Sequence, residues 1–159
     1  MALFQISEPG LSAAPHEHRL AIGIDLGTTN SLVASVISGV AEVIADENGD
    51  VLLPSAVHYG EDGEVTVGRK ALVGAVDDAA NTITSAKRLI GRKLEDLKDV
   101  HAVPYRLVDD ATMVKIETRA GVKSPIEVSS EILRNLANRA ESRSVSYTHL
   151  RAHETCADL

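Results

Sequence analysis

A short polar stretch near the start of the chain combines residue types that can bind a nucleotide phosphate and its metal. It reads Gly23-Ile24-Asp25-Leu26-Gly27-Thr28-Thr29-Asn30-Ser31. A carboxylate such as that of Asp25 can hold a hard cation through the cation's bound waters, and successive backbone N–H groups with threonine hydroxyls can cradle phosphate oxygens. The stretch therefore predicts a phosphate site, with an ordinary hairpin that has a polar turn as the plain alternative.

The flanking residues predict that this stretch is the bend of a β-hairpin. Apolar residues alternate with small or charged ones over 20–26, and a second apolar run follows over 32–36. Gly27 leaves room for the backbone to approach a ligand closely, which a side chain there would obstruct. A third strand over 41–45, ended by Asn48-Gly49, would extend the hairpin into an antiparallel meander.

The rest of the chain alternates short strands with helices. We expect a hairpin from 56–59 and 64–67, a helix over 69–76, and a strand pair from 105–108 and 113–118.

The segment Ser124-Pro125-Ile126-Glu127 carries the signature of a helix start. Serine is the N-cap, proline takes the first helical position, and glutamate stands three residues after the cap. Apolar residues then recur at near-helical spacing, and we expect them to form the core face of this helix. They are Ile126, Leu133, Leu136, Ala137 and Ala140.

A basic cluster interrupts the middle of this acidic chain. It reads Lys87-Arg88-Leu89-Ile90-Gly91-Arg92, and positive charges gathered in this way invite an anionic ligand. On pattern alone, the favoured interpretation is a solvated, charged helix end stopped by Gly91. We interpret His58, on one of the expected strands, as structural, because no second metal-ligating residue stands at ligand spacing from it.

Composition narrows the classes of function. With 159 residues, of which 44% are hydrophobic, the chain can bury one core, so we expect one domain or part of one. The net charge of -7 opposes general affinity for nucleic acid or an anionic membrane. A single cysteine and the absence of a signal segment predict a cytoplasmic protein. No apolar stretch approaches the roughly 20 residues that a transmembrane helix needs.

The two motifs together resemble the nucleotide-binding domain of the DnaK-type heat-shock chaperones. The resemblance rests on 23–31, followed by Asn81-Thr82-Ile83 and then by 87–92, and two motifs at that separation are more specific than either alone. It covers roughly residues 3–143. The opening Gln5-Ile6-Ser7-Glu8-Pro9-Gly10, with Pro15-His16 and Arg19-Leu20-Ala21 after it, further resembles a branch of the family that serves iron-sulfur cluster assembly.

The resemblance implies an α/β fold of the actin-like, ribonuclease-H-like ATPase type, with ATP or ADP and magnesium as ligands. It gives Asp25 the role of binding magnesium through water and makes Lys87 the catalytic lysine, with Asp25 as the second catalytic residue. A lysine ammonium there can stabilise charge on the γ-phosphate and orient the attacking water. The resemblance assigns the first phosphate loop to Gly27, Thr28, Thr29 and Asn30.

The resemblance also divides the chain. Residues 1–19 are an arm, and 20–143 are a partial nucleotide-binding domain. Within it, 20–54 and 124–143 belong to the inner subdomain and 55–123 form the outer one. The family's second phosphate loop, adenosine site, peptide-binding domain and lid do not follow, so we expect this chain alone to bind ATP weakly and to complete no catalytic cycle.

Residues 144–159 depart from the family pattern. They resemble translated adaptor DNA, and we interpret them as foreign. His149, His153 and Cys156 are spaced for one helix face and could imitate a zinc site, an interpretation that we do not favour in a foreign tail.

The leading hypothesis is therefore the amino-terminal fragment of an ATP-dependent molecular chaperone, which binds and hydrolyses ATP to control client binding in iron-sulfur cluster assembly and protein folding. For the full-length protein, the resemblance implies a J-domain co-chaperone and an iron-sulfur scaffold protein as partners. One alternative is a carbohydrate kinase of the same superfamily, against which the segment around Lys87 argues. Another is a non-catalytic module whose hairpin and acidic surface recognise a protein.

Overall fold

The first sheet is an antiparallel meander that carries the polar stretch at one end. A computed structural model describes residues 21–37, 39–97 and 103–154 of the chain, with side chains in the last helix described as far as Arg143. Strands β1 (Ile22–Asp25), β2 (Asn30–Ile37) and β3 (Val40–Val43) pair in the order β1-β2-β3, and β4 (Leu53–Pro54) pairs with the start of β2. The predicted hairpin and third strand are thus confirmed.

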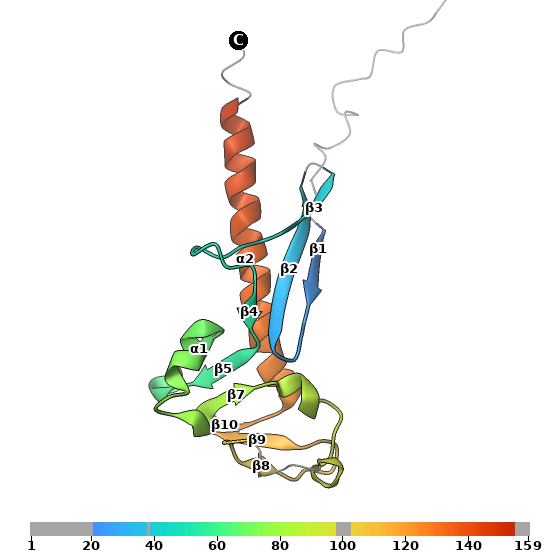
Figure 1. The fold of residues 1–159 in the computed structure, drawn as a ribbon, viewed down its shortest axis with the longest axis vertical. Coiled ribbons are helices and arrows are strands. Elements are labelled where there is room, and N and C mark those ends of the chain that lie inside the picture. The colour runs from blue at the N-terminus through green and yellow to red at the C-terminus, as the bar shows by residue number, and fades with distance from the viewer. Residues whose placement is uncertain (1–20, 38, 98–102, 155–159) are drawn as a thin grey trace, which may run out of the picture.

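Two smaller sheets lie at the lower end of the molecule in Figure 1, which is the end that holds the β1–β2 bend. The second sheet has the order β6-β5-β7, from β5 (Ala56–Tyr59), β6 (Val65–Val67) and β7 (Thr82–Thr84). The third has the order β10-β9-β8, from β8 (Leu107–Val108), β9 (Lys115–Thr118) and β10 (Gly121–Lys123). Both predicted strand pairs form, although Tyr105 joins the core instead of a strand.

Short helices connect the strands of the second and third sheets. Helix α1 (Arg69–Gly74) ends two residues before the predicted end of that helix. The remaining connections are single turns of 3-10 helix: η1 (Glu61–Gly63), η2 (Ala79–Asn81), η3 (Ala86–Leu89) and η4 (Leu94–Asp96). The basic cluster therefore begins on the short 3-10 turn η3, whereas the sequence pattern favoured a solvated, charged helix end stopped by Gly91.

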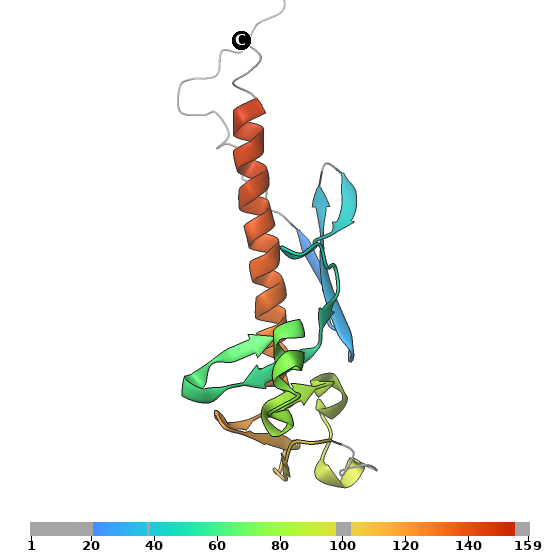
Figure 2. The ribbon, with the colours of Figure 1, turned by 60° about the vertical axis from the view of Figure 1, so that its left-hand side comes forward.

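The long helix α2 (Pro125–Glu154) runs alongside the first sheet (Figures 1 and 2). Its predicted start is confirmed. The Glu127 N–H donates to Ser124 Oγ at 3.1 Å, and the Ser124 N–H donates to Glu127 Oε2 at 2.7 Å. These two bonds satisfy amide groups that the first helical turn cannot pair, and they fix the point at which the helix leaves β10.

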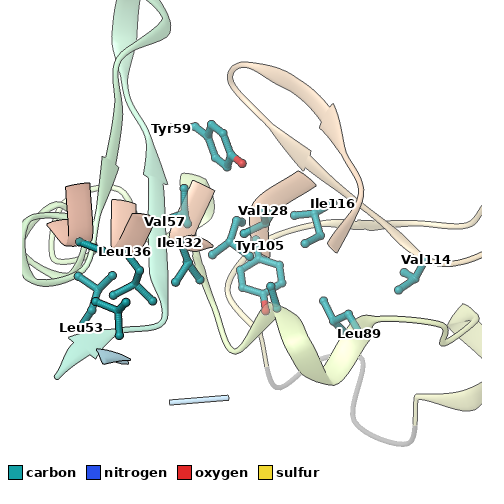
Figure 3. Close-up of a cluster of buried hydrophobic side chains, with 14 of the residues drawn as sticks. Leu53, Val57, Tyr59, Leu89, Tyr105, Val114, Ile116, Val128, Ile132 and Leu136 are labelled. Atoms are coloured by element: carbon teal, nitrogen blue, oxygen red, sulfur yellow. The ribbon is translucent and has the colours of Figure 1, made fainter. Parts of the chain in front are cut away.

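The core lies where α2 crosses the sheets (Figure 3). The helix contributes Val128, Ile132, Leu136 and Ala140, all at most 2% exposed. The predicted core face was wrong at two positions, because Ile126 is 52% exposed and Leu133 is 37% exposed. Apolar residues lie on two sides of α2, and those on each side recur with the helical period of 3.6 residues. Periodicity alone therefore could not show which side packs against the sheets.

Several predictions concern residues outside the described part of the chain. The arm at 1–19 and Cys156 lie there, as do the side chains of His149 and His153, although the α2 backbone is described to Glu154. Within the described ranges, none of the helices has both the length and the apolar character that crossing a bilayer requires.

Candidate functional site

The bend between β1 and β2 carries the polar stretch, with Asp25 as the last residue of β1 and Asn30 as the first of β2. The bend is tight, because a Cβ added to Gly27 would lie 2.0 Å from the Asn30 carbonyl oxygen. This changes the reason for glycine at position 27. The sequence suggested that glycine leaves room for a ligand, whereas the structure shows that any side chain would collide with the bend itself.

The side chain of Lys87 reaches this bend from η3. Its Nζ donates a hydrogen bond to the Leu26 carbonyl oxygen at 2.7 Å, across 61 positions of sequence. In Figures 1 and 2 the lower end of the β1–β2 hairpin meets the yellow-green turn that follows β7. The structure therefore brings Lys87 together with the bend that carries Asp25, Thr28 and Thr29.

Two buried serines tie the bend to the rest of the protein. The Gly27 N–H donates to Ser31 Oγ at 3.2 Å, the two serine hydroxyls lie 2.9 Å apart, and Ser55 Oγ donates to the Gly27 carbonyl oxygen at 2.9 Å. Ser31 is 1% exposed and Ser55 is 4% exposed. Local sequence patterns did not single out Ser55. A hydroxyl inside the apolar run at 53–57 was the available signal, because a buried hydroxyl needs a partner.

Polar groups of the bend remain available to a ligand. Asp25 is exposed, and none of the described residues donates a hydrogen bond to its carboxylate or forms an ion pair with it. The hydroxyls of Thr28 and Thr29 also have no partner in the ranges that the structure covers, and the Asn30 residue is exposed. An acceptor for a hydrated cation thus lies beside hydroxyl donors for phosphate oxygens, so the residues present fit magnesium and a phosphate.

A group of charged side chains around Asp78 is paired away from the bend. His58 Nε2 lies 3.4 Å from Asp78 Oδ2, and Arg119 lies 3.1 Å from the same oxygen. The pKa of Asp78 is lowered, first by the hydrogen bond from Asn81 and then by that from His58. In the described part of the chain, no three acidic, histidine or cysteine side chains gather as a metal site would require.

A separate hollow of about 800 Å³ lies between the loop after β3, strand β6 and α2. Two of its arginines form ion pairs: Arg139 lies 3.7 Å from the Asp46 carboxylate, and Arg69 lies 2.9 Å from that of Asp50. Neither Asp25 nor Lys87 lines it. The hollow is therefore distinct from the bend.

Known proteins share this sequence pattern. A family model described as Hsp70 protein matches residues 21–147, which include the bend, Ser55 and Lys87. The chain belongs to the Hsp70 family. Membership confirms the resemblance to DnaK-type chaperones and implies the actin-like ATPase fold, of which the sheets and helices described here form a part.

Several bacterial members of the Hsp70 family are similar to this chain, each named Chaperone protein HscA homolog. The one from Laribacter hongkongensis is 62% identical over 142 residues, the one from Chromobacterium violaceum 61% over 142, and the one from Methylobacillus flagellatus 60% over 141. Each comparison covers 89% of this chain and 23% of the relative, so the chain spans less than a quarter of the curated relatives that it matches. The resemblance to a specialised branch is confirmed, and the branch is HscA. The carbohydrate-kinase alternative gains no support.

Proposed function

We propose that this chain is the first part of the nucleotide-binding domain of an ATP-dependent chaperone, which binds and hydrolyses ATP to control its grip on clients. One observation carries the proposal. The Lys87 ammonium lies 2.7 Å from the Leu26 carbonyl oxygen and so stands beside the bend that holds the candidate phosphate groups. Family membership supports the same assignment.

Lys87 would act on the terminal phosphate of ATP. An ammonium has three N–H donors, and the bond to Leu26 uses one of them. The other two can reach a phosphate oxygen and the attacking water. Positive charge placed there in advance stabilises the charge that builds up during phosphoryl transfer.

The bend would hold the phosphates and their metal. Asp25, an exposed carboxylate, would bind magnesium through its water shell, and Thr28, Thr29 and Asn30 would donate to phosphate oxygens. Gly27 would keep the bend tight enough for these groups to face one ligand. Magnesium, when bound, supplies positive charge that offsets the charge of the phosphates.

The proposed subdomains, cellular setting and partners are based on family membership. We propose that 20–54 and 124–143 belong to an inner subdomain and 55–123 to an outer one, so that closure around ATP alters client affinity in a separate domain. Iron-sulfur cluster assembly in the cytoplasm is the proposed setting, with a J-domain co-chaperone and an iron-sulfur scaffold protein as partners.

A chimera provides a complete protein for testing this proposal. Residues 21–147 of this chain replace the matched segment of the full-length Laribacter hongkongensis relative, and ATP binding is measured by calorimetry with magnesium or with a chelator. We expect Asp25→Asn to weaken binding with magnesium and to change it little with the chelator. Asp109→Asn, which alters an exposed aspartate remote from the bend, is the control.

Two results would reject the proposed function. One is the absence of ATP binding by the folded chimera. The other is an equal loss of ATP affinity in Asp25→Asn with magnesium and with the chelator, because Asp25 would then not act through magnesium. Phosphate transfer from ATP to a sugar, in place of water, would favour a carbohydrate kinase.

A further inference from the structure

The direction of each hydrogen bond around Gly27 can be deduced. A backbone N–H only donates, a carbonyl oxygen only accepts, and a serine hydroxyl has one proton. The Ser55 hydroxyl donates its one proton to the Gly27 carbonyl oxygen. Ser31 must therefore be the donor in the 2.9 Å hydrogen bond between the two hydroxyls. The Gly27 N–H then donates to Ser31. The three bonds form a closed ring that begins and ends on Gly27, called the serine ring below.

The serine ring sets the orientation of both peptide groups next to Gly27. In a planar trans peptide the C=O and the N–H point in opposite directions. Because the Gly27 C=O points to the buried Ser55, the Thr28 N–H of the same peptide points away from it. Because the Gly27 N–H points to Ser31, the Leu26 C=O points the other way, and that oxygen accepts the bond from Lys87.

Both outward groups belong to the proposed phosphate site. The Thr28 N–H has no acceptor among the residues that the structure describes, so it is free to donate to a phosphate oxygen. The Leu26 oxygen anchors the Lys87 ammonium. Neither group touches Ser55, yet rotation of either peptide would require the serine ring to break.

The backbone of Ser55 also joins the bend to the segment that carries Lys87. Its N–H donates to the Thr29 carbonyl oxygen at 2.8 Å, and its carbonyl oxygen accepts from the Ser85 N–H at 3.3 Å. Ser85 has the left-handed φ of 55° immediately before η3 begins at Ala86. Ser55 therefore contacts the bend and the start of the Lys87 turn at the same time.

We infer that Ser55 is a positioning residue for the nucleotide phosphates, acting through the serine ring on the Thr28 N–H and on the Leu26 anchor of Lys87. This inference rests on the proposed function. It goes beyond it, because neither serine side chain would touch ATP. Loss of the Ser55 hydroxyl leaves the Gly27 carbonyl oxygen without a partner and frees both peptides to turn.

The test compares four variants of the chimera by their dissociation constants for ATP, measured at a temperature where each variant is folded by circular dichroism. We expect Ser55→Ala, which loses two of the three bonds of the serine ring, to bind ATP about tenfold more weakly. Ser55→Thr keeps the hydroxyl and should recover most of the affinity. Ser31→Ala removes the bond from the Gly27 N–H and the bond between the two serines, so its loss of affinity should resemble that of Ser55→Ala. It provides a second test if Ser55→Ala does not fold.

Ser129→Ala is the matched control. Ser129 is 4% exposed, like Ser55, and its Oγ donates to the Pro125 carbonyl oxygen at 2.8 Å within α2, with no bond to the serine ring. The Ser129→Ala variant should unfold at a lower temperature than the parent chimera, because it loses a buried hydrogen bond like those of Ser55. Its affinity for ATP should stay within about twofold of that of the parent chimera.

The outcomes separate the inference from the proposed function. No ATP binding by the folded parent chimera rejects the proposed function and the inference with it. Normal ATP binding by the parent together with unchanged affinity in folded Ser55→Ala and Ser31→Ala overturns the inference alone. An equal loss of affinity in Ser129→Ala also overturns it, because general destabilisation would then account for the effect.

Discussion

Lys87 Nζ and the Leu26 carbonyl oxygen lie 2.7 Å apart, although the two residues are separated by 61 positions in the sequence. The contact places a positive charge against the end of the β1–β2 hairpin. Leu26 is followed at once by Gly27, whose two backbone groups are held by buried serines. The Leu26 carbonyl oxygen holds the ammonium in place, and the two remaining N–H donors of that ammonium can bind a polyphosphate beside the bend.

The tightness of the bend can be tested with a pair of glycine variants in the chimera. Gly27→Ala should abolish measurable ATP binding and destabilise the protein, because the new Cβ would meet the Asn30 carbonyl oxygen at 2.0 Å. Gly23→Ala, on the adjoining strand β1, has nothing within 4 Å of the new Cβ and should leave ATP affinity unchanged. Calorimetry and thermal unfolding give both readouts. Similar behaviour of the two variants would contradict the structure of the bend.

Hydrogen exchange distinguishes a nucleotide site from a protein-binding module. Amides in 23–31 of the chimera should exchange more slowly when ATP and magnesium are added, because phosphate oxygens would then accept from the bend. The strands β9 and β10 lie in another sheet and serve as the internal control. Identical exchange of 23–31 with and without nucleotide is the result that a non-catalytic module predicts.

The cap of α2 predicts a dependence of stability on pH. The Ser124 N–H donates to the Glu127 carboxylate and lowers the pKa of that group below its ordinary value of 4.5. The fold thus favours the charged form, so its contribution is fully present above 4.5 and is lost as pH falls through the lowered folded value.

Thermal unfolding of the chimera and of its Glu127→Gln variant, measured over a range of pH, tests whether this contribution to stability is lost on acidification. The stabilising difference between them should be constant near neutral pH and should shrink once the pH drops below 4.5. A difference that grows on acidification would mean that the carboxylate is not held by the cap.

Exposed apolar side chains predict self-association of the 159-residue chain by itself. On the first sheet, Val36 is 56% exposed, Val40 is 60% exposed and Val43 is 46% exposed. Uncovered apolar surface of this kind on a sheet with an open edge favours association between copies. Light scattering should detect oligomers or aggregates, and Val40→Lys should reduce them. A monomeric chain with a cooperative melt would contradict the prediction.

The sequence was sufficient to predict the hairpin and the helix cap, because both depend on residues that are close together in the sequence. Alternation over 20–26 sets the strand, and Ser124 with Glu127 forms a cap that needs no distant partner. The approach of Lys87 to the bend could not be predicted from neighbouring residues. Pattern alone favoured a solvated helix end, and only the resemblance to a family linked the two motifs.

The serine ring and the core face of α2 could not be predicted from local patterns. The hydrogen bonds of Ser55 join three segments that meet only in the folded chain, so no local pattern around Ser55 predicts them. Ile126 and Ile132 are both apolar, and the difference in their exposure, 52% against 1%, depends on where the sheets lie.

Lys87→Ala in the chimera tests the central claim most directly, with Lys70→Ala on the exposed surface of α1 as the control. Hydrolysis is followed as single-turnover phosphate release, and nucleotide binding is measured on the same samples. Removing a positioned charge of this kind should slow hydrolysis by about 100-fold or more while ATP stays bound. Lys70→Ala should leave both hydrolysis and ATP binding unchanged. Unchanged turnover in Lys87→Ala would contradict the role assigned to this lysine.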